Sequence, residues 1–149
     1  MKKTRLKSKE TNKILSIYDL ALTKKDQVEL LEGEFKIIAI NKIPAFFYTQ
    51  EQWVPTLKYL QNNTLLKKIT VDMGAVKFVV NGADIMRPGI VEIESEIKKD
   101  DFIVIIDQNN KKSLAVGIAL LNSEEMQNTS SGKVIKNIHY VGDELWNLQ

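Results

Sequence analysis

Small residues close to basic side chains are the feature of this sequence best suited to holding a ligand. The residues concerned are Gly74, Ala75, Lys77, Arg87, Pro88 and Gly89. Glycine lets a backbone come close to a sugar-phosphate chain, and a helix start, which Gly74 and Ala75 predict here, favours a phosphate group. Lysine and arginine add positive charge, and arginine holds phosphate through paired hydrogen bonds. The pattern favours a phosphate-binding surface.

The same pattern has a structural alternative. Small residues also let a helix pack tightly on a sheet, and Arg87 can be a turn residue with a surface salt bridge. For Gly82 and Ala83 the sequence alone favours this structural interpretation. The pairs Lys67-Lys68 and Lys111-Lys112 add further positive charge, for which solvated surface is the default alternative.

Catalytic and metal-binding residue sets are missing from the sequence. It contains no cysteine and a single histidine, His139, so thiol chemistry and sites with two imidazoles are excluded. A Ser-His-Asp set, a Gly-x-Gly-x-x-Gly fingerprint and a Walker lysine are also absent. We expect no enzyme activity, no cofactor and no metal, and we expect His139 to make a structural hydrogen bond.

Composition is that of a folded protein with dispersed charge. The 149 residues are 44% hydrophobic and carry a net charge of +2, with five basic residues among the first nine. Apolar runs stay far short of the ~20 residues that a membrane span needs, and no apolar segment follows the basic N-terminus as in a secretory signal. Together with the missing cysteines, this predicts a cytoplasmic protein that does not enter a membrane.

The first 65 residues predict a small α+β domain. Apolar spacing indicates a helix over residues 8–20, capped at Ser8, with Ile14, Leu15, Ile17 and Tyr18 on one side. Strands are expected over residues 27–32, 35–40 and 43–48, the last at a sheet edge because it contains Pro44. A helix over residues 55–61 should begin with Pro55 in its first turn. The polar run 62–64 marks a domain boundary near residue 65.

Residues 66–149 predict a small β-barrel. Strands are expected over residues 67–71, 102–107, 113–121 and 134–140, with a short buried helix over 73–80. In the turn 86–90, Pro88 fixes its own φ and Gly89 supplies an unusual one. Ser123 should cap a further helical turn. Because the boundary is short and apolar residues flank it, we expect the two domains to pack together.

The second half resembles a PUA domain. The likeness lies in the run from Val71 to Ile90, which contains Met-Gly-Ala-Val, Asn-Gly-Ala-Asp and Met-Arg-Pro-Gly-Ile, and in Val116-Gly117. The C-terminal Ile-His-Tyr-x-x-Asp-x-Leu-Trp and the Val-Pro-Thr-Leu that begins at Val54 extend it. The whole chain is thereby similar to the family of the malignant T-cell amplified sequence protein, with its archaeal single-chain relatives and the N-terminal part of ligatin. The likeness is weaker over residues 1–50.

This resemblance implies an α+β protein in which a small N-terminal domain, residues 1–65, precedes a PUA pseudo-β-barrel, residues 66–149. It also implies a non-catalytic role in translation, with binding to the tRNA acceptor end and the small ribosomal subunit. Density-regulated protein is the partner of the eukaryotic relative, and the sequence leaves a protein partner here open. The RNA-contact residues expected from the resemblance and the lysine pairs are Lys67, Lys68, Gly74, Ala75, Lys77, Arg87, Pro88 and Gly89.

Two other functions fit the same residues. PUA domains often accompany enzymes that modify tRNA or rRNA, so the chain could be a detached specificity module for such an enzyme. A protein-interaction adaptor is the third alternative. Salt-dependent binding of tRNA disfavours the adaptor, and co-sedimentation with small ribosomal subunits separates the first two functions.

Overall fold

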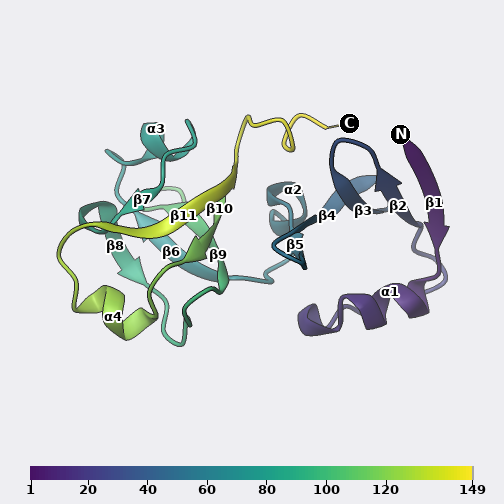
Figure 1. Cartoon of the computed structure of the whole chain (residues 1–149), viewed down its shortest axis with the longest axis horizontal. Helices are drawn as coiled ribbons and strands as arrows, with labels where there is room; N and C mark the ends of the chain where they lie inside the picture. The colour runs from purple at the N-terminus through teal and green to yellow at the C-terminus, as the bar shows by residue number, and fades with distance from the viewer. Residues whose placement is uncertain (149) are drawn as a thin grey trace. The chain divides into compact units, whose positions relative to one another are not determined.

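The computed structural model describes residues 1–148 and divides the chain into two compact units. One unit holds residues 1–65 together with Leu148, and the other holds residues 66–147. Each unit combines one β-sheet with short helices, so the α+β prediction is confirmed (Figure 1). Among the described residues, no helix is long and apolar enough to cross a membrane.

The N-terminal unit is built on an antiparallel sheet of five strands in the order β1-β2-β3-β4-β5. The strands are β1 (Lys2–Leu6), β2 (Val28–Glu32), β3 (Lys36–Ile40), β4 (Ile43–Thr49) and β5 (Gln52–Pro55). Two helices, α1 (Ser8–Ile14) and α2 (Leu57–Leu60), and the 3-10 turn η1 (Ser16–Tyr18) complete it. Its core contains Leu15, Val28, Ile38, Ile40, Ala45 and Phe46.

Strand β1 was not predicted, because its residues lack apolar alternation. Four of its five residues are exposed, and only Leu6 packs against the core. Main-chain pairing holds it in place instead, in an unbroken register from Lys2 opposite Glu32 to Leu6 opposite Val28. The basic N-terminus is therefore an edge strand, and lysine is a residue that protects such edges.

The predicted helix over residues 8–20 is shorter than expected. Helix α1 ends at Ile14 and a 3-10 turn follows, with Asp19 in the left-handed region at φ 52°. Leu15 is fully buried, but Ile14 and Ile17 are 49% and 67% exposed, so the expected single apolar side is wrong. Ser8 is the first helical residue, not the cap, and its hydroxyl donates to the carbonyl of Thr23.

Both prolines of the N-terminal unit lie in the sheet. Pro55 ends strand β5, and Thr56 caps α2 by accepting from the N–H of Tyr59, so the expectation that Pro55 starts a helix is wrong. Pro44 lies in β4, which is paired on both sides, so it is not at an edge. The β3–β4 register shifts next to Pro44, and this irregularity accommodates a residue that cannot donate a hydrogen bond.

The C-terminal unit is a six-stranded sheet in the order β7-β11-β10-β9-β6-β8. The strands are β6 (Lys67–Val71), β7 (Ile85–Met86), β8 (Ile90–Ile93), β9 (Phe102–Asp107), β10 (Ser113–Ala119) and β11 (Lys133–Tyr140). Its helices are α3 (Val76–Val79) and α4 (Ser123–Gln127), and η2 (Arg87–Gly89) is a 3-10 turn. All pairings are antiparallel except β6 with β9.

The two edge strands of this sheet, β7 and β8, are joined only by the three residues of η2. Such a short connection holds both edges of the sheet close together, so the sheet must curl on itself (Figure 1). The curled sheet encloses a core rich in isoleucine, including Ile69, Ile103, Ile105 and Ile135. The predicted pseudo-barrel is thus confirmed.

Strand β10 approaches β11 closely at Gly117. The register shifts between Val116 and Gly117, and a Cβ atom built on Gly117 would lie 2.5 Å from Cγ2 of Ile135 and 2.9 Å from the carbonyl oxygen of Lys136. Glycine is therefore required here by space, which explains the Val-Gly pair in the sequence.

Two local expectations for this unit are corrected. Gly89 does not adopt positive φ, because it continues the 3-10 turn η2. Asn122, not Ser123, caps α4, in a capping box with Glu125. Ser123 instead joins the helix to the preceding loop, because its hydroxyl accepts from the N–H of Ile97 and donates to the carbonyl of Glu94.

Candidate nucleic-acid interface

The segment before α3 is a tight turn organised by Asp72. The N–H of Ala75 donates to the Asp72 carboxylate at 2.9 Å and also to its carbonyl oxygen at 3.1 Å. A carboxylate therefore already lies at the start of α3, which is only four residues long. The N–H of Ala75 is therefore satisfied by Asp72 and is not free to face a phosphate.

The turn η2 packs directly against this segment. The N–H of Asp72 donates to the carbonyl of Gly89 at 2.9 Å, and a Cβ atom on Gly89 would lie 3.3 Å from Cβ of Ala75. The predicted residues Gly74, Ala75 and Gly89 are thus brought together, although they are up to 15 positions apart in the chain. A Cβ atom at Gly89 would crowd Ala75 by a few tenths of an ångström, so glycine favours this close packing.

The side chain of Arg87 holds η2 in place through hydrogen bonds to two main-chain carbonyls. Its Nε donates to the carbonyl of Met126 at 2.7 Å and its Nη1 to the carbonyl of Ile90 at 3.1 Å. The side chain is half-buried and ties the turn to the end of α4. The backbone of Arg87 adds a bond from its N–H to the carbonyl of Gly132. Two of five guanidinium N–H donors are used in this way, so donors remain for a ligand.

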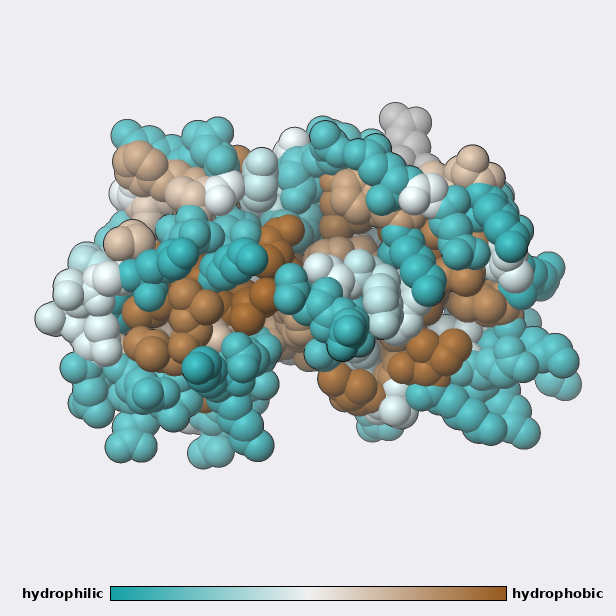
Figure 2. Space-filling model, viewed as in Figure 1, coloured by the Kyte–Doolittle hydropathy of each residue, from teal (hydrophilic) through white to brown (hydrophobic). Residues whose placement is uncertain are grey.

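Lys77 and Phe78 point outward from α3. Val79 is buried, whereas Phe78 is 58% exposed. Lys77 is also exposed, and its ammonium lies 5.2 Å from the centroid of the Phe78 ring. Figure 2 shows hydrophobic and hydrophilic side chains side by side over α3. Sequence reasoning missed Phe78, although the inward spacing of Val76, Val79 and Val80 leaves it on the outer face.

These residues form one surface, which we call the α3–η2 surface. It consists of Gly74, Ala75, Lys77, Phe78, Pro88 and Gly89. Lys133 is a basic neighbour that the sequence did not single out. It lies opposite Met86 in the β7–β11 register and forms an ion pair with Asp84 at 3.4 Å.

Lys67 and Lys68 lie at the other end of β6, the strand that leads into this segment. The ammonium of Lys67 donates to the carbonyl of Glu96 at 2.8 Å, and the Lys68 side chain is exposed. The five-residue strand, at about 3.3 Å per residue, separates them from Gly74. The structure therefore does not bring this pair into the α3–η2 surface.

Gly82 and Ala83 have structural roles, as the sequence suggested. Gly82 adopts φ 89°, and a Cβ atom there would lie 2.9 Å from the ring of Tyr140. The side-chain amide of Asn137 donates to the carbonyls of Val79 and Ala83, which fixes the end of α3 against β11.

His139 and Asp143 form the centre of the C-terminal turn. His139 is 1% exposed and its Nδ1 lies 2.9 Å from Oδ2 of Asp143. The same carboxylate accepts from the N–H groups of Tyr140 and Trp146. Burial raises the pKa of Asp143, but the hydrogen bonds from His139, Trp146 and Tyr140 outweigh it, so the net pKa is lowered. The structural hydrogen bond expected for His139 is confirmed.

The aromatic side chains of the N-terminal unit are mostly core residues. Phe46 and Phe47 are buried, whereas Tyr48 is 42% exposed and meets Trp53 edge to face at 5.1 Å between ring centroids. Two of the three consecutive strand aromatics therefore fill the core. The Lys36 ammonium lies 5.0 Å from the Tyr48 ring, so the exposed pair is partly covered.

Comparison with known protein families assigns both units. A model described as "PUA domain" matches residues 67–141, and one described as "Domain of unknown function (DUF1947)" matches residues 2–63. The chain belongs to the PUA-domain family. The α3–η2 surface lies within the segment that matches the PUA model.

Relatives of this chain match it over nearly its whole length. An uncharacterized protein of Methanocaldococcus jannaschii is 43% identical over 95% of this chain and 88% of its own length. Translation machinery-associated protein 20 of Saccharomyces cerevisiae is 32% identical over 94% of this chain and 82% of its own. Malignant T-cell-amplified sequence 1 of Rattus norvegicus is 31% identical over 86% of this chain and 74% of its own length. The predicted resemblance is therefore confirmed.

Solved structures agree with the PUA fold. A hypothetical protein from Pyrococcus horikoshii superposes with a TM-score of 0.82 at 30% identity, covering 97% of this chain and 98% of that one. A chain of an H/ACA ribonucleoprotein bound to a substrate RNA gives a TM-score of 0.52 at 26% identity, covering 64% of this chain and 29% of that one.

The PUA unit carries exposed groups that suit contact with a nucleic acid. Within residues 1–148, no group of three or more histidine, cysteine, aspartate or glutamate side chains is placed to hold a metal ion. The α3–η2 surface combines an exposed cation and an exposed aromatic ring with closely packed small residues. A cation suits phosphate, and an aromatic face suits an unpaired base.

Proposed function

We propose that this protein binds RNA in translation without catalysing a reaction, and that it contacts the tRNA acceptor end and the small ribosomal subunit from the cytoplasm. The name of the yeast relative, translation machinery-associated protein 20, supports a role in translation. The observation that carries the RNA contact is the close packing of Ala75 against Gly89, beside the outward Lys77 and Phe78. A Cβ atom on Gly89 would lie only 3.3 Å from Cβ of Ala75.

The structure suggests a role for each residue of the proposed site. Lys77 faces a phosphate, and Phe78 stacks on an unpaired base. Gly74 and Pro88, both exposed, line the approach of the sugar-phosphate chain, and Ala75 and Gly89 keep the two segments in contact.

Arg87 and the lysine pair act from outside that contact. Arg87 holds η2 in place and offers its remaining N–H donors to phosphate. Lys68 adds positive charge at the other end of β6. Lys67 also adds positive charge there, although its ammonium already donates one hydrogen bond to the Glu96 carbonyl.

Binding of a tRNA transcript over a range of salt concentrations tests this proposal. Each neutralised phosphate should add about −0.7 to −0.9 to the slope of log affinity against log salt. A transcript that lacks its unpaired 3′ nucleotides should bind more weakly if Phe78 stacks on a base. Equal affinity for both transcripts, together with a slope near zero, would contradict the proposal.

A second function is supported by the likeness to a chain of the H/ACA ribonucleoprotein bound to substrate RNA. In that case the protein would be a detached specificity module for an enzyme that modifies tRNA or rRNA. Affinity purification from growing cells separates the two functions. Translation predicts co-sedimentation with small ribosomal subunits, and the alternative predicts co-purification with a modifying enzyme and no ribosomal subunit.

A further inference from the structure

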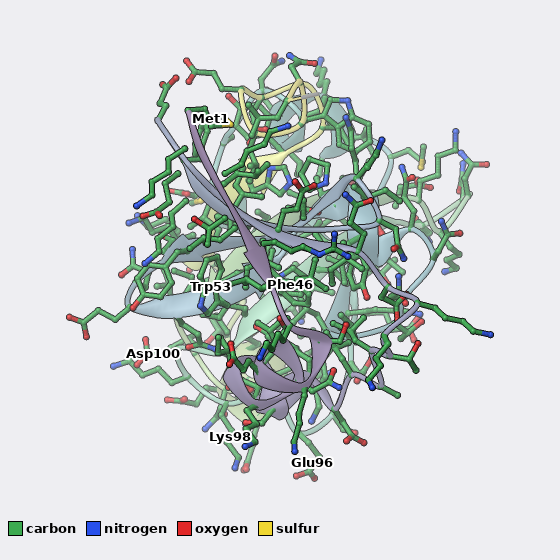
Figure 3. All side chains as sticks on the ribbon, turned by 90° about the vertical axis from the view of Figure 1, so that its right-hand side faces the viewer. Met1, Phe46, Trp53, Glu96, Lys98 and Asp100 are labelled. Carbon is green, nitrogen blue, oxygen red and sulfur yellow. The ribbon has the colours of Figure 1, made fainter. Side chains whose placement is uncertain are left out.

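A groove in the N-terminal unit is lined by basic side chains from three separate segments. Arg5 is in β1, Lys7 and Lys9 are at the beginning of α1, and Lys24 is in the loop before β2. Leu6 and Leu22 form its apolar lining, and the cavity measures about 900 Å³. Figure 3 views the molecule from the side on which β1 and α1 lie in front.

The four cations of this basic groove are not neutralised by the protein. All four side chains are exposed, and none takes part in an ion pair within the described residues 1–148. Arg5 lies opposite Glu29 in the β1–β2 register, but no ion pair forms between them. Unpaired cations around one cavity produce a positive potential that attracts anions.

The one acidic residue that lines the groove is already engaged. Asp26 accepts from the N–H of Thr23 at 2.8 Å and from the side-chain amide of Asn41 at 3.0 Å. The hydrogen bond from Asn41 and that from Thr23 lower the pKa of Asp26. Its charge therefore organises the loop, and the lining keeps three more positive than negative groups, counting four cations against one carboxylate.

The walls of the groove are preformed. Asn12 in α1 both donates to the carbonyl of Leu22 and accepts from its N–H, and the Ser8 hydroxyl donates to the carbonyl of Thr23. These three bonds fix the loop against α1. A ligand that enters the groove need not order this loop, which lowers the entropic cost of binding.

From these observations we infer that the basic groove binds the sugar-phosphate backbone of RNA, as a second contact in addition to the α3–η2 surface. Exposed cations match a row of phosphates, and the apolar lining suits ribose. Because the PUA unit belongs to the same chain, RNA held there has a raised local concentration at the groove. The inference goes beyond the proposed function, which assigns no RNA contact to residues 1–65.

A charge-matched pair of variants tests the groove. In the groove variant Arg5, Lys7, Lys9 and Lys24 are all changed to Gln, in the full-length chain. The control variant makes the same charge change at four other exposed lysines, Lys42, Lys98, Lys99 and Lys136. All substitutions are of exposed side chains, and a thermal melt verifies that both variants fold like the wild type.

Salt-dependent binding of a tRNA transcript is the measurement. We expect the groove variant to flatten the slope of log affinity against log salt by about 3, since each lost phosphate contact removes about 0.7 to 0.9. The control variant should change it by less than about 1. Equal slopes for the two variants would overturn the inference, and an acidic protein partner would then be the occupant to seek.

Crosslinking separates this inference from the proposed function. Ultraviolet irradiation of the complex should link RNA to peptides that contain Lys9 or Lys24, and the groove variant should lose these links. If Lys77 and Phe78 variants keep full affinity while the groove variant loses it, the proposed function of the α3–η2 surface fails and the groove remains. If links form only in residues 66–147, the groove inference fails.

Discussion

The Nε of Arg87 donates to the carbonyl of Met126 at 2.7 Å, across 39 positions of the chain. This bond ties the turn between the two sheet edges to the end of α4. Arg87→Ala should therefore lower the free energy of unfolding by about 1–3 kcal/mol, because it removes two hydrogen bonds from a half-buried cation. It should also weaken tRNA binding, since η2 loses its support. Chemical denaturation and a binding titration measure both effects.

Arg87→Lys separates charge from geometry. Lysine keeps the charge but lacks the planar fork that reaches two carbonyls, so we expect only partial recovery of stability. Full recovery of stability by lysine would show that the two hydrogen bonds contribute little. Unchanged tRNA affinity in a folded Arg87→Ala protein would remove Arg87 from the site.

Lys77 and Phe78 should affect RNA binding without affecting stability. Both are exposed, so Lys77→Gln and Phe78→Ala should each change the free energy of unfolding by no more than about 0.5 kcal/mol. Phe78→Ala should weaken binding of tRNA by about 1–3 kcal/mol through lost base stacking. Lys77→Gln should instead flatten the salt slope by about 0.7 to 0.9. Lys99→Gln, at another exposed lysine, is the control, and an equal effect there would refute a specific role for Lys77.

Gly117→Ala should be the most destabilising of the glycine substitutions. Its new methyl group would meet Ile135 at 2.5 Å and a main-chain oxygen at 2.9 Å, so β10 and β11 must move apart. We expect a loss of about 2–3 kcal/mol by thermal or chemical denaturation, in the range typical of overpacked sites. Gly33→Ala is the control, because the nearest atom there is the flexible end of Met1 at 3.4 Å. Similar losses at both positions would contradict the steric argument.

Asp143 should make stability depend on acid pH. Its folded-state pKa lies below the ordinary value of 3.8, so the carboxylate stabilises the folded state most where it is ionised in both states. This contribution is complete above the ordinary pKa and is lost as pH falls through 3.8 and through the lower folded-state pKa. Asp143→Ala should cost about 2 kcal/mol at neutral pH and reduce this dependence. Denaturation curves between pH 2 and about 7 test it, and parallel acid profiles for both proteins would contradict it.

Tyr18 should make stability depend on alkaline pH. Burial, partly opposed by a hydrogen bond with Gln52, raises its pKa to about 12, and its hydroxyl donates to the carbonyl of Trp53. The resulting stabilisation is complete below the ordinary value of 10.0 and is lost as pH rises through about 12. Burial also raises the pKa of Tyr59, so absorbance of tyrosinate should show late-titrating groups, one of which Tyr18→Phe removes. Titration of all tyrosines together near pH 10 would contradict this.

Sequence reasoning succeeded where a residue's environment follows from its neighbours in the chain. The apolar alternation predicted β2, β3, β4, β6, β9, β10 and β11 within two residues. Strand β1 was not predicted, because its charged residues are held by main-chain pairing with β2 and show no apolar pattern. Ile14 and Ile17 were wrongly expected inside, because the helix ends between them and the 3-10 turn changes the direction of the side chains.

The candidate site was also predicted only in part. Sequence motifs identified Gly74, Ala75 and Gly89, and the fold places these residues in one contact. The anchoring of Arg87 depends on the Met126 carbonyl, and a main-chain oxygen that distant carries no sequence signal. Lys67 and Lys68 are near Gly74 in the chain. They lie far from it in space because the intervening residues form an extended strand, which rises more per residue than a helix does.

Strand β1 has one more consequence, for behaviour at high concentration. It is an outer strand of its sheet, and three of its five residues, Lys2, Lys3 and Arg5, are basic. A second copy that tried to extend the sheet along β1 would bring two rows of like charge face to face, before any main-chain bond could form. Arg5, which also lines the groove, thus both attracts a polyanion and works against self-aggregation through this edge.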